Sequence, residues 1–235
     1  MSEAAQRPPP PAPPPAPPRE PPRSRVRVWD WPTRAFHWLL VALIPALWWT
    51  AENERTELHV TLGVLAAGLL LFRLIWGLIG SSTARFANFL KGPRGIVSYL
   101  NGRAAHVLGH NPLGGWSVFV MLALLCAQVG LGLFASDEDG LVMGPFSLWL
   151  ESDTVERVTE LHETLFVVLA AVIAFHVAAI IFYALVKRRN LVGPMLTGTG
   201  AAPEGSAPMS PASTWRLLVA LAVAGGVAYW LWTKL

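Results

Sequence analysis

The chain has 235 residues, of which 53% are hydrophobic and only 14% are charged, with a formal net charge of +3. This composition, with its eleven tryptophans, is typical of a membrane protein and argues against a large soluble domain. The positive charge lies in loops beside apolar segments, so it indicates membrane orientation and not nucleic-acid binding. The single cysteine, Cys126, excludes an internal disulfide, a thiolate zinc site and an iron–sulfur cluster.

The first 24 residues contain eleven of the twenty prolines, in runs such as PPPPAPPPAPP. Proline lacks a backbone donor, so this stretch cannot form a helix or a packed core. We therefore predict a disordered, proline-rich tail over residues 1–24.

Five apolar blocks follow the tail, each near the length of about 20 residues that a helix needs to cross a membrane. They lie at residues 35–51, 58–79, 113–134, 161–186 and 215–232. Pro45 would kink the first helix, which a membrane bundle tolerates when neighbouring groups satisfy the freed carbonyl. We predict a four-helix membrane domain over 25–196, a flexible linker over 197–213 and an additional transmembrane helix over 214–235. The predicted fold class is all-α integral membrane, a four-helix transmembrane bundle plus a fifth, C-terminal transmembrane helix.

The basic residues are concentrated before the first helix, between the second and third helices, and after the fourth. The other two connections contain only Arg55 and Arg157. The positive-inside rule therefore predicts a multi-pass protein with a cytoplasmic N-terminus. The connection between the third and fourth helices is acidic, which would either attract a basic soluble partner or simply be solvated.

Four histidines lie within the apolar blocks or at their ends, namely His37, His59, His162 and His176. Ionisable groups in a membrane are costly enough to indicate function, although a lone histidine can also serve as an interhelical hydrogen bonder. His162 and His176 are 14 residues apart, which is about 21 Å along a helix and returns to within about 40° of the same face. The topology brings His37 to the level of His176, and His59 to that of His162. The spacing therefore predicts two stacked histidine pairs.

Two pairs of neutral imidazoles inside a four-helix bundle suit two b-type haems, each with a bis-histidine iron. Zinc is the competing ligand, but it usually takes more ligands per site, often carboxylates or thiolates. Arg73 lies 14 residues after His59 and would pair with haem propionates at the other level, or extend to the lipid headgroups. His106 and His110 would take up protons or line a quinone pocket, or be ordinary solvated loop side chains.

Several stretches together resemble the bacterial di-haem cytochrome b561 and hydrogenase-type cytochrome b group. They are VRVWDWPTRAFHW, LHVTLG, RLIWGLIG, RFANFLKGPRGIVSYL, LGHNPLGGW, LHETLF and NLVGPMLTG, within residues 26–198. The resemblance implies a four-helix bundle in the bacterial inner membrane, with two haem b groups held by the same four histidines. It also implies electron transfer with a c-type cytochrome, a hydrogenase or another redox partner. The quinone pool is a further candidate partner, and a homodimer a candidate assembly.

The function predicted from these observations is that of a membrane di-haem cytochrome that relays electrons across the membrane, as a component of a respiratory chain. One alternative is a haem-containing anchor subunit of a hydrogenase or dehydrogenase complex. Another is a small-ion transporter with histidines along its path, which predicts no haem. The glycines of LGHNPLGGW lack GxGxxG spacing and lie between membrane helices, which argues against a dinucleotide fold.

Overall fold

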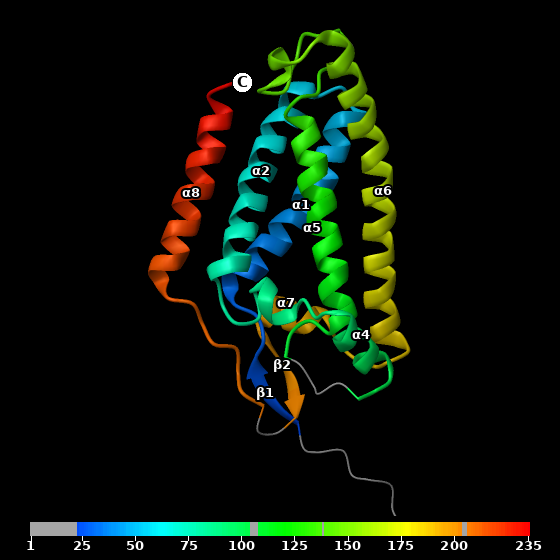
Figure 1. The fold of residues 1–235 in the computed structure, drawn as a ribbon, viewed down its shortest axis with the longest axis vertical. Coiled ribbons are helices and arrows are strands. Elements are labelled where there is room, and N and C mark those ends of the chain that lie inside the picture. Colours follow the sequence, from blue (N-terminus) through cyan, green and yellow to red (C-terminus); the bar gives the residue numbers. More distant parts are fainter. Residues whose placement is uncertain (1–22, 104–107, 138, 204–205) are drawn as a thin grey trace, which may run out of the picture.

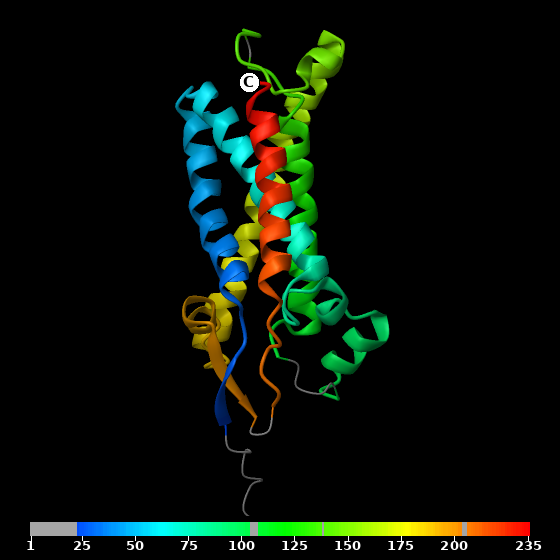
Figure 2. The same cartoon turned by 90° about the vertical axis from the view of Figure 1, so that its left-hand side faces the viewer.

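The computed structural model describes residues 23–103, 108–137, 139–203 and 206–235. In these residues five helices are long and apolar enough to cross a membrane. They are α1 (Trp31–Glu52), α2 (Thr56–Ile79), α5 (Pro112–Gly132), α6 (Ser152–Leu185) and α8 (Thr214–Trp232), and they run side by side (Figures 1 and 2). The predicted fold class, a helical membrane bundle with a fifth C-terminal helix, is confirmed. The predicted tail lies outside the described residues, apart from its last two positions.

Shorter elements connect the long helices. They are β1 (Arg23–Arg27), α3 (Phe86–Phe89), α4 (Pro93–Leu100), the 3-10 helix η1 (Ser147–Trp149), α7 (Val192–Thr197) and β2 (Thr199–Pro203). Two long helices begin with the same local signal, a side-chain cap followed by proline. Asp30 accepts a hydrogen bond from the Thr33 amide at 2.9 Å, and Asn111 accepts one from the Gly114 amide at 2.7 Å. Both caps satisfy amides that the first helical turn leaves free.

The helix α2 is the centre of the bundle. It packs against α1, α5 and α8, and α5 in turn packs against α6. The buried side chains between these helices include Leu70, Trp76, Leu122 and Leu169. The two outer helices of the four-helix unit, α1 and α6, do not pack extensively on each other.

A two-stranded antiparallel sheet extends from one end of the bundle (Figure 1). Strand β1 precedes α1 and pairs with β2, which follows α6 and α7. Next to the sheet, the Val28 amide donates to the Gly198 carbonyl at 2.8 Å, and the Trp38 indole donates to the Met195 carbonyl at 3.1 Å. These bonds fix the start of α1 relative to the chain that leaves α6. We call this end of the bundle the sheet end and the opposite end the far end.

The C-terminal segment returns along the sheet end before it enters α8. Ser82 and Ser210 are joined by two hydrogen bonds of 3.0 and 2.9 Å, and the Met209 amide donates to the Arg27 carbonyl at 2.9 Å. The helix α8 then packs closely on α2, because a Cβ on Gly68 would lie 2.7 Å from the Cβ of Ala228. The glycine allows the two helix backbones to approach, as small residues do in membrane helices.

Candidate functional site

At the far end, His59 on α2 and His162 on α6 form a facing pair. Their ring centroids are 6.2 Å apart and their planes are nearly perpendicular, at 87°. Metal–imidazole bonds are about 2.0–2.1 Å long. Two imidazoles on opposite sides of one ion therefore have ring centroids separated by about the 6.2 Å found here. The pair is therefore spaced to hold one metal ion between the rings.

Both rings of the far-end pair are oriented by backbone carbonyls. The Nδ1 atom of His59 lies 2.9 Å from the Leu47 carbonyl on α1, and that of His162 lies 2.9 Å from the Gln128 carbonyl on α5. A carbonyl only accepts, so each Nδ1 carries the proton and donates. Each Nε2 is then left with the lone pair that a metal requires, and a ligating histidine usually donates its other ring N–H to a carbonyl in this way.

Other side chains hold these carbonyls and rings in place. Thr50 is almost completely buried and its hydroxyl donates to the Leu47 carbonyl at 2.8 Å. The Gln128 amide nitrogen donates to the His162 carbonyl at 3.0 Å. A Cβ on Gly132 would lie 3.0 Å from Cε1 of His162, so the ring rests against the α5 backbone. The position of His162 is thus set mainly by α5.

At the sheet end, His37 on α1 and His176 on α6 are both half-buried and close enough to interact electrostatically. The Nδ1 atom of His37 is buried and makes no hydrogen bond with any described residue. The two histidine pairs therefore differ, because both far-end Nδ1 atoms donate to carbonyls whereas His37 has no such partner.

Arg73 lies on α2 and is 2% exposed. Its guanidinium stands over the Phe86 ring, 4.9 Å from the centroid, and its Nη1 atom is buried without a partner among the described residues. A buried guanidinium keeps its charge, so the free donor is suited to a carboxylate. The structure therefore gives Arg73 a buried position, and not the extended one expected of a residue that reaches the headgroups.

His110 is packed between two aromatic rings, with centroid distances of 4.7 Å to Trp29 and 4.8 Å to Phe89. Its Nδ1 atom is buried and unpaired among the described residues. Burial, together with the positive charge of Arg73, lowers the pKa of His110 to about 3, so the ring is neutral at neutral pH. It is not the solvated side chain considered from the sequence. His106 lies outside the described residues.

A glycine leaves open space next to His59 on α2. Gly63 follows His59 by one helical turn on the same face, and a Cβ built there would meet nothing within 4 Å. Among the described residues, no group of three or more His, Cys, Asp and Glu lies close enough together to hold a metal ion. Histidine pairs with open space beside them fit a haem better than a zinc ion, which usually needs three or four protein ligands.

The sequence analysis did not single out Gln128, Thr50 or the Leu47 carbonyl. Gln128 had one available signal, since it is a polar residue in the middle of an apolar block. Leu47 contributes only its backbone carbonyl, which accepts the Nδ1 proton of His59, and every residue type has such a carbonyl. The sequence therefore gives no signal for it.

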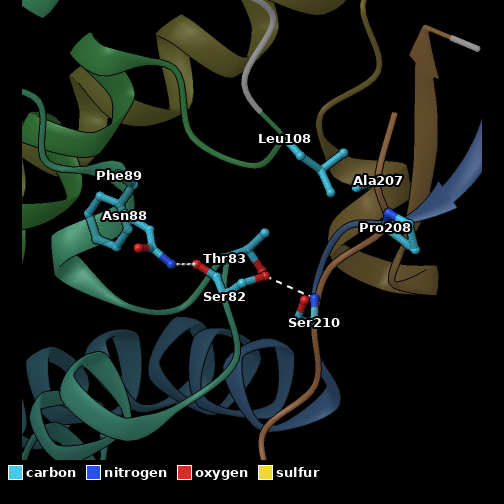
Figure 3. A pocket seen from close by; sticks show the side chains of 8 residues that line it. All are labelled: Ser82, Thr83, Asn88, Phe89, Leu108, Ala207, Pro208 and Ser210. Atoms are coloured by element: carbon cyan, nitrogen blue, oxygen red, sulfur yellow. Dashed lines mark hydrogen bonds between the residues drawn. The ribbon is translucent and has the colours of Figure 1, made fainter. Parts of the chain in front are cut away.

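A surface pocket of about 300 Å³ lies at the sheet end, apart from the paired rings. Figure 3 shows its lining, Ser82, Thr83, Asn88, Phe89, Leu108, Ala207, Pro208 and Ser210. The polar groups that line it mostly bond to one another or to the backbone. Asn88, for example, donates to the Ser82 carbonyl at 2.7 Å. We assign this pocket no ligand.

Facing histidines on membrane helices, with protonated Nδ1 atoms and adjacent open space, are typical of membrane b-type cytochromes. The family model for prokaryotic cytochrome b561 matches residues 28–198. The chain therefore belongs to the prokaryotic cytochrome b561 family, and it is a multi-pass membrane protein that transfers electrons through haem b. The match ends before α8. Searches among curated proteins and among solved structures gave no match.

Proposed function

We propose that the protein is a di-haem electron relay. One haem b is held by His59 and His162 at the far end, and a second by His37 and His176 at the sheet end. The observation that carries the proposal is the far-end pair, with rings 6.2 Å apart and both Nδ1 protons donated to carbonyls. The 14-residue spacing of His162 and His176 on α6 puts the second site about 21 Å away along the helix axis.

Each haem supplies a one-electron centre, and the protein supplies its ligands and electrostatic surroundings. The Leu47 and Gln128 carbonyls hold protons at the Nδ1 atoms of the far-end pair, which keeps Nε2 available for iron. Arg73 offers its unpaired guanidinium nitrogen to a propionate of the sheet-end haem. Leu70 and Leu122 belong to the buried hydrophobic core of the same bundle.

The finer proposal concerns orientation and partners. The basic connections adjoin the sheet end, so we propose that this end faces the cytoplasm of a bacterial inner membrane. The acidic connection before α6 would then lie on the outer face, where it favours a basic redox partner such as a c-type cytochrome. We propose electron exchange between such a partner, or a redox enzyme, and the quinone pool. Assembly as a homodimer remains a prediction.

The experiment that tests the proposal is a pyridine haemochrome assay with a reduced-minus-oxidised spectrum on the purified full-length protein, alongside His59→Ala and His176→Ala. We expect two haems b per chain, and one haem in each variant, with different spectra for the two that remain. Loss of both haems in both variants would point to unfolding, so circular dichroism is recorded on the same samples. A folded protein that binds no haem when haem is supplied would overturn the proposal.

Potentiometry during turnover separates the relay from the anchor alternative. A relay requires both haems to be reduced and reoxidised at the rate of electron transfer to the partner. Haems that stay in one redox state during turnover would favour an anchor subunit.

A further inference from the structure

The Gln128 side chain lies against a histidine that we assign as a haem ligand. Its amide nitrogen donates to the His162 carbonyl at 3.0 Å and lies 3.2 and 3.3 Å from the two ring nitrogens. The residue is only 8% exposed, and its Oε1 atom is buried without a partner among the described residues. Leaving a buried acceptor unpaired destabilises a fold, so packing alone does not account for an amide at this position.

Gln128 contacts His162 both through its side chain and through its backbone. Its side chain holds the His162 backbone, and its own carbonyl accepts the Nδ1 proton at 2.9 Å. A hydrogen bond from Nδ1 to a carbonyl makes the imidazole a more basic ligand, which favours oxidised iron. The hydrogen bond to the Gln128 carbonyl therefore lowers the reduction potential of the far-end haem.

The histidine pair at the sheet end has different surroundings. The Nδ1 atom of His37 donates to no described residue, so the His37 ring lacks the hydrogen bond that makes His162 a more basic ligand. The structure therefore gives the two sites unequal surroundings.

We propose that Gln128 is a positioning residue of the far-end haem, which holds His162 with Nε2 toward the iron and keeps the potential of that haem below that of the sheet-end haem. This inference rests on the proposed function. It adds to that function a residue outside the ligand set and an order for the two potentials.

Two variants of nearly the same size separate this role from simple packing. Gln128→Met and Gln128→Leu both remove the amide that donates to the His162 carbonyl and keep a side chain of similar size. Leu122→Met on the same helix is the control, because Leu122 is equally buried but belongs to the hydrophobic core. All are made in the full-length, haem-loaded protein. The readouts are haem content, a potentiometric titration and the low-temperature EPR spectrum of the ferric haems.

In the unaltered protein, we expect the lower of two potentials to belong to the haem that is missing from His162→Ala. In Gln128→Met, we expect that potential to rise by at least about 59 mV, which corresponds to a tenfold change in the reduction equilibrium of a one-electron couple. One of the two EPR signals should change with it. Gln128→Leu should show the same rise, and the other haem and the Leu122→Met protein should be unaffected.

Loss of the far-end haem alone in both Gln128 variants, with both haems retained in Leu122→Met, would also support the positioning role. Unchanged potentials in both Gln128 variants, an equal change in Leu122→Met, or a change confined to the sheet-end haem would overturn the inference and leave the proposed function intact. The absence of haem from the unaltered protein would instead overturn the proposed function.

Discussion

A single methyl group on Gly132 should weaken haem binding at the far end. In Gly132→Ala, the new Cβ would lie 3.0 Å from Cε1 and 3.4 Å from Nδ1 of His162. Ordinary carbon contacts are about 3.5–4.0 Å, so the ring must shift by roughly half an ångström. Overpacking of this kind costs about 1–3 kcal/mol, and the helix preference of alanine does not offset it because α5 is helical with and without haem. A loss of about 1–3 kcal/mol corresponds to roughly 5- to 150-fold weaker binding.

The assay is a titration of the haem-depleted protein with haem, in which the two sites are distinguished by their spectra. The matched control is Gly130→Ala, two residues earlier on α5, where a new Cβ meets nothing within 4 Å. Both substitutions raise helix preference alike, so only the contact with His162 differs. The reasoning is refuted if the two variants bind haem equally, or if Gly132→Ala weakens the sheet-end site.

Three further predictions use other features of the structure. Gly63→Leu should fill the open space beside the far-end pair, so the haemochrome assay should show one haem; two retained haems would contradict it. The thermal melt of the haem-free protein should not be lowered, because leucine has a higher helix preference than glycine. Gly68→Leu should overlap Ala228 and weaken the α2–α8 contact by about 1–3 kcal/mol, which limited proteolysis of the segment before α8 would detect. Its control is Gly226→Leu on α8, where a Cβ meets nothing within 4 Å, and equal proteolysis of the two would be contrary evidence. Because the folded-state pKa of His110 is lowered from 6.5 to about 3, the unfolded chain binds a proton there that the folded chain does not, so stability should fall as the pH decreases below about 6.5. Denaturation curves from pH 7.5 to 5 should show this slope, and His110→Phe should reduce it; the same slope in the variant would exclude His110 as its origin.

The helices were predictable because membrane spans are specified by local composition. The predicted and observed helix boundaries differ where a helical segment is polar. The predicted fourth span covers 161–186, whereas α6 begins at Ser152, since the polar stretch SDTVERVTE is helical but not apolar. The sheet was not predicted, because β1 and β2 pair residues more than 170 positions apart, and short polar segments carry no signal of such pairing.

Spacing along single helices was enough to group the four histidines by level, because the rise and turn of an α-helix are constant. Spacing could not tell which atoms would hold the rings. The Nδ1 partners of His59 and His162 are backbone carbonyls 12 and 34 residues away, and any residue type would supply a carbonyl. Only the packing of α1 on α2 and of α5 on α6 brings those carbonyls within 2.9 Å. The same packing buries Gln128 and Arg73 at opposite ends of the bundle, so the difference between the two sites is a property of the tertiary structure.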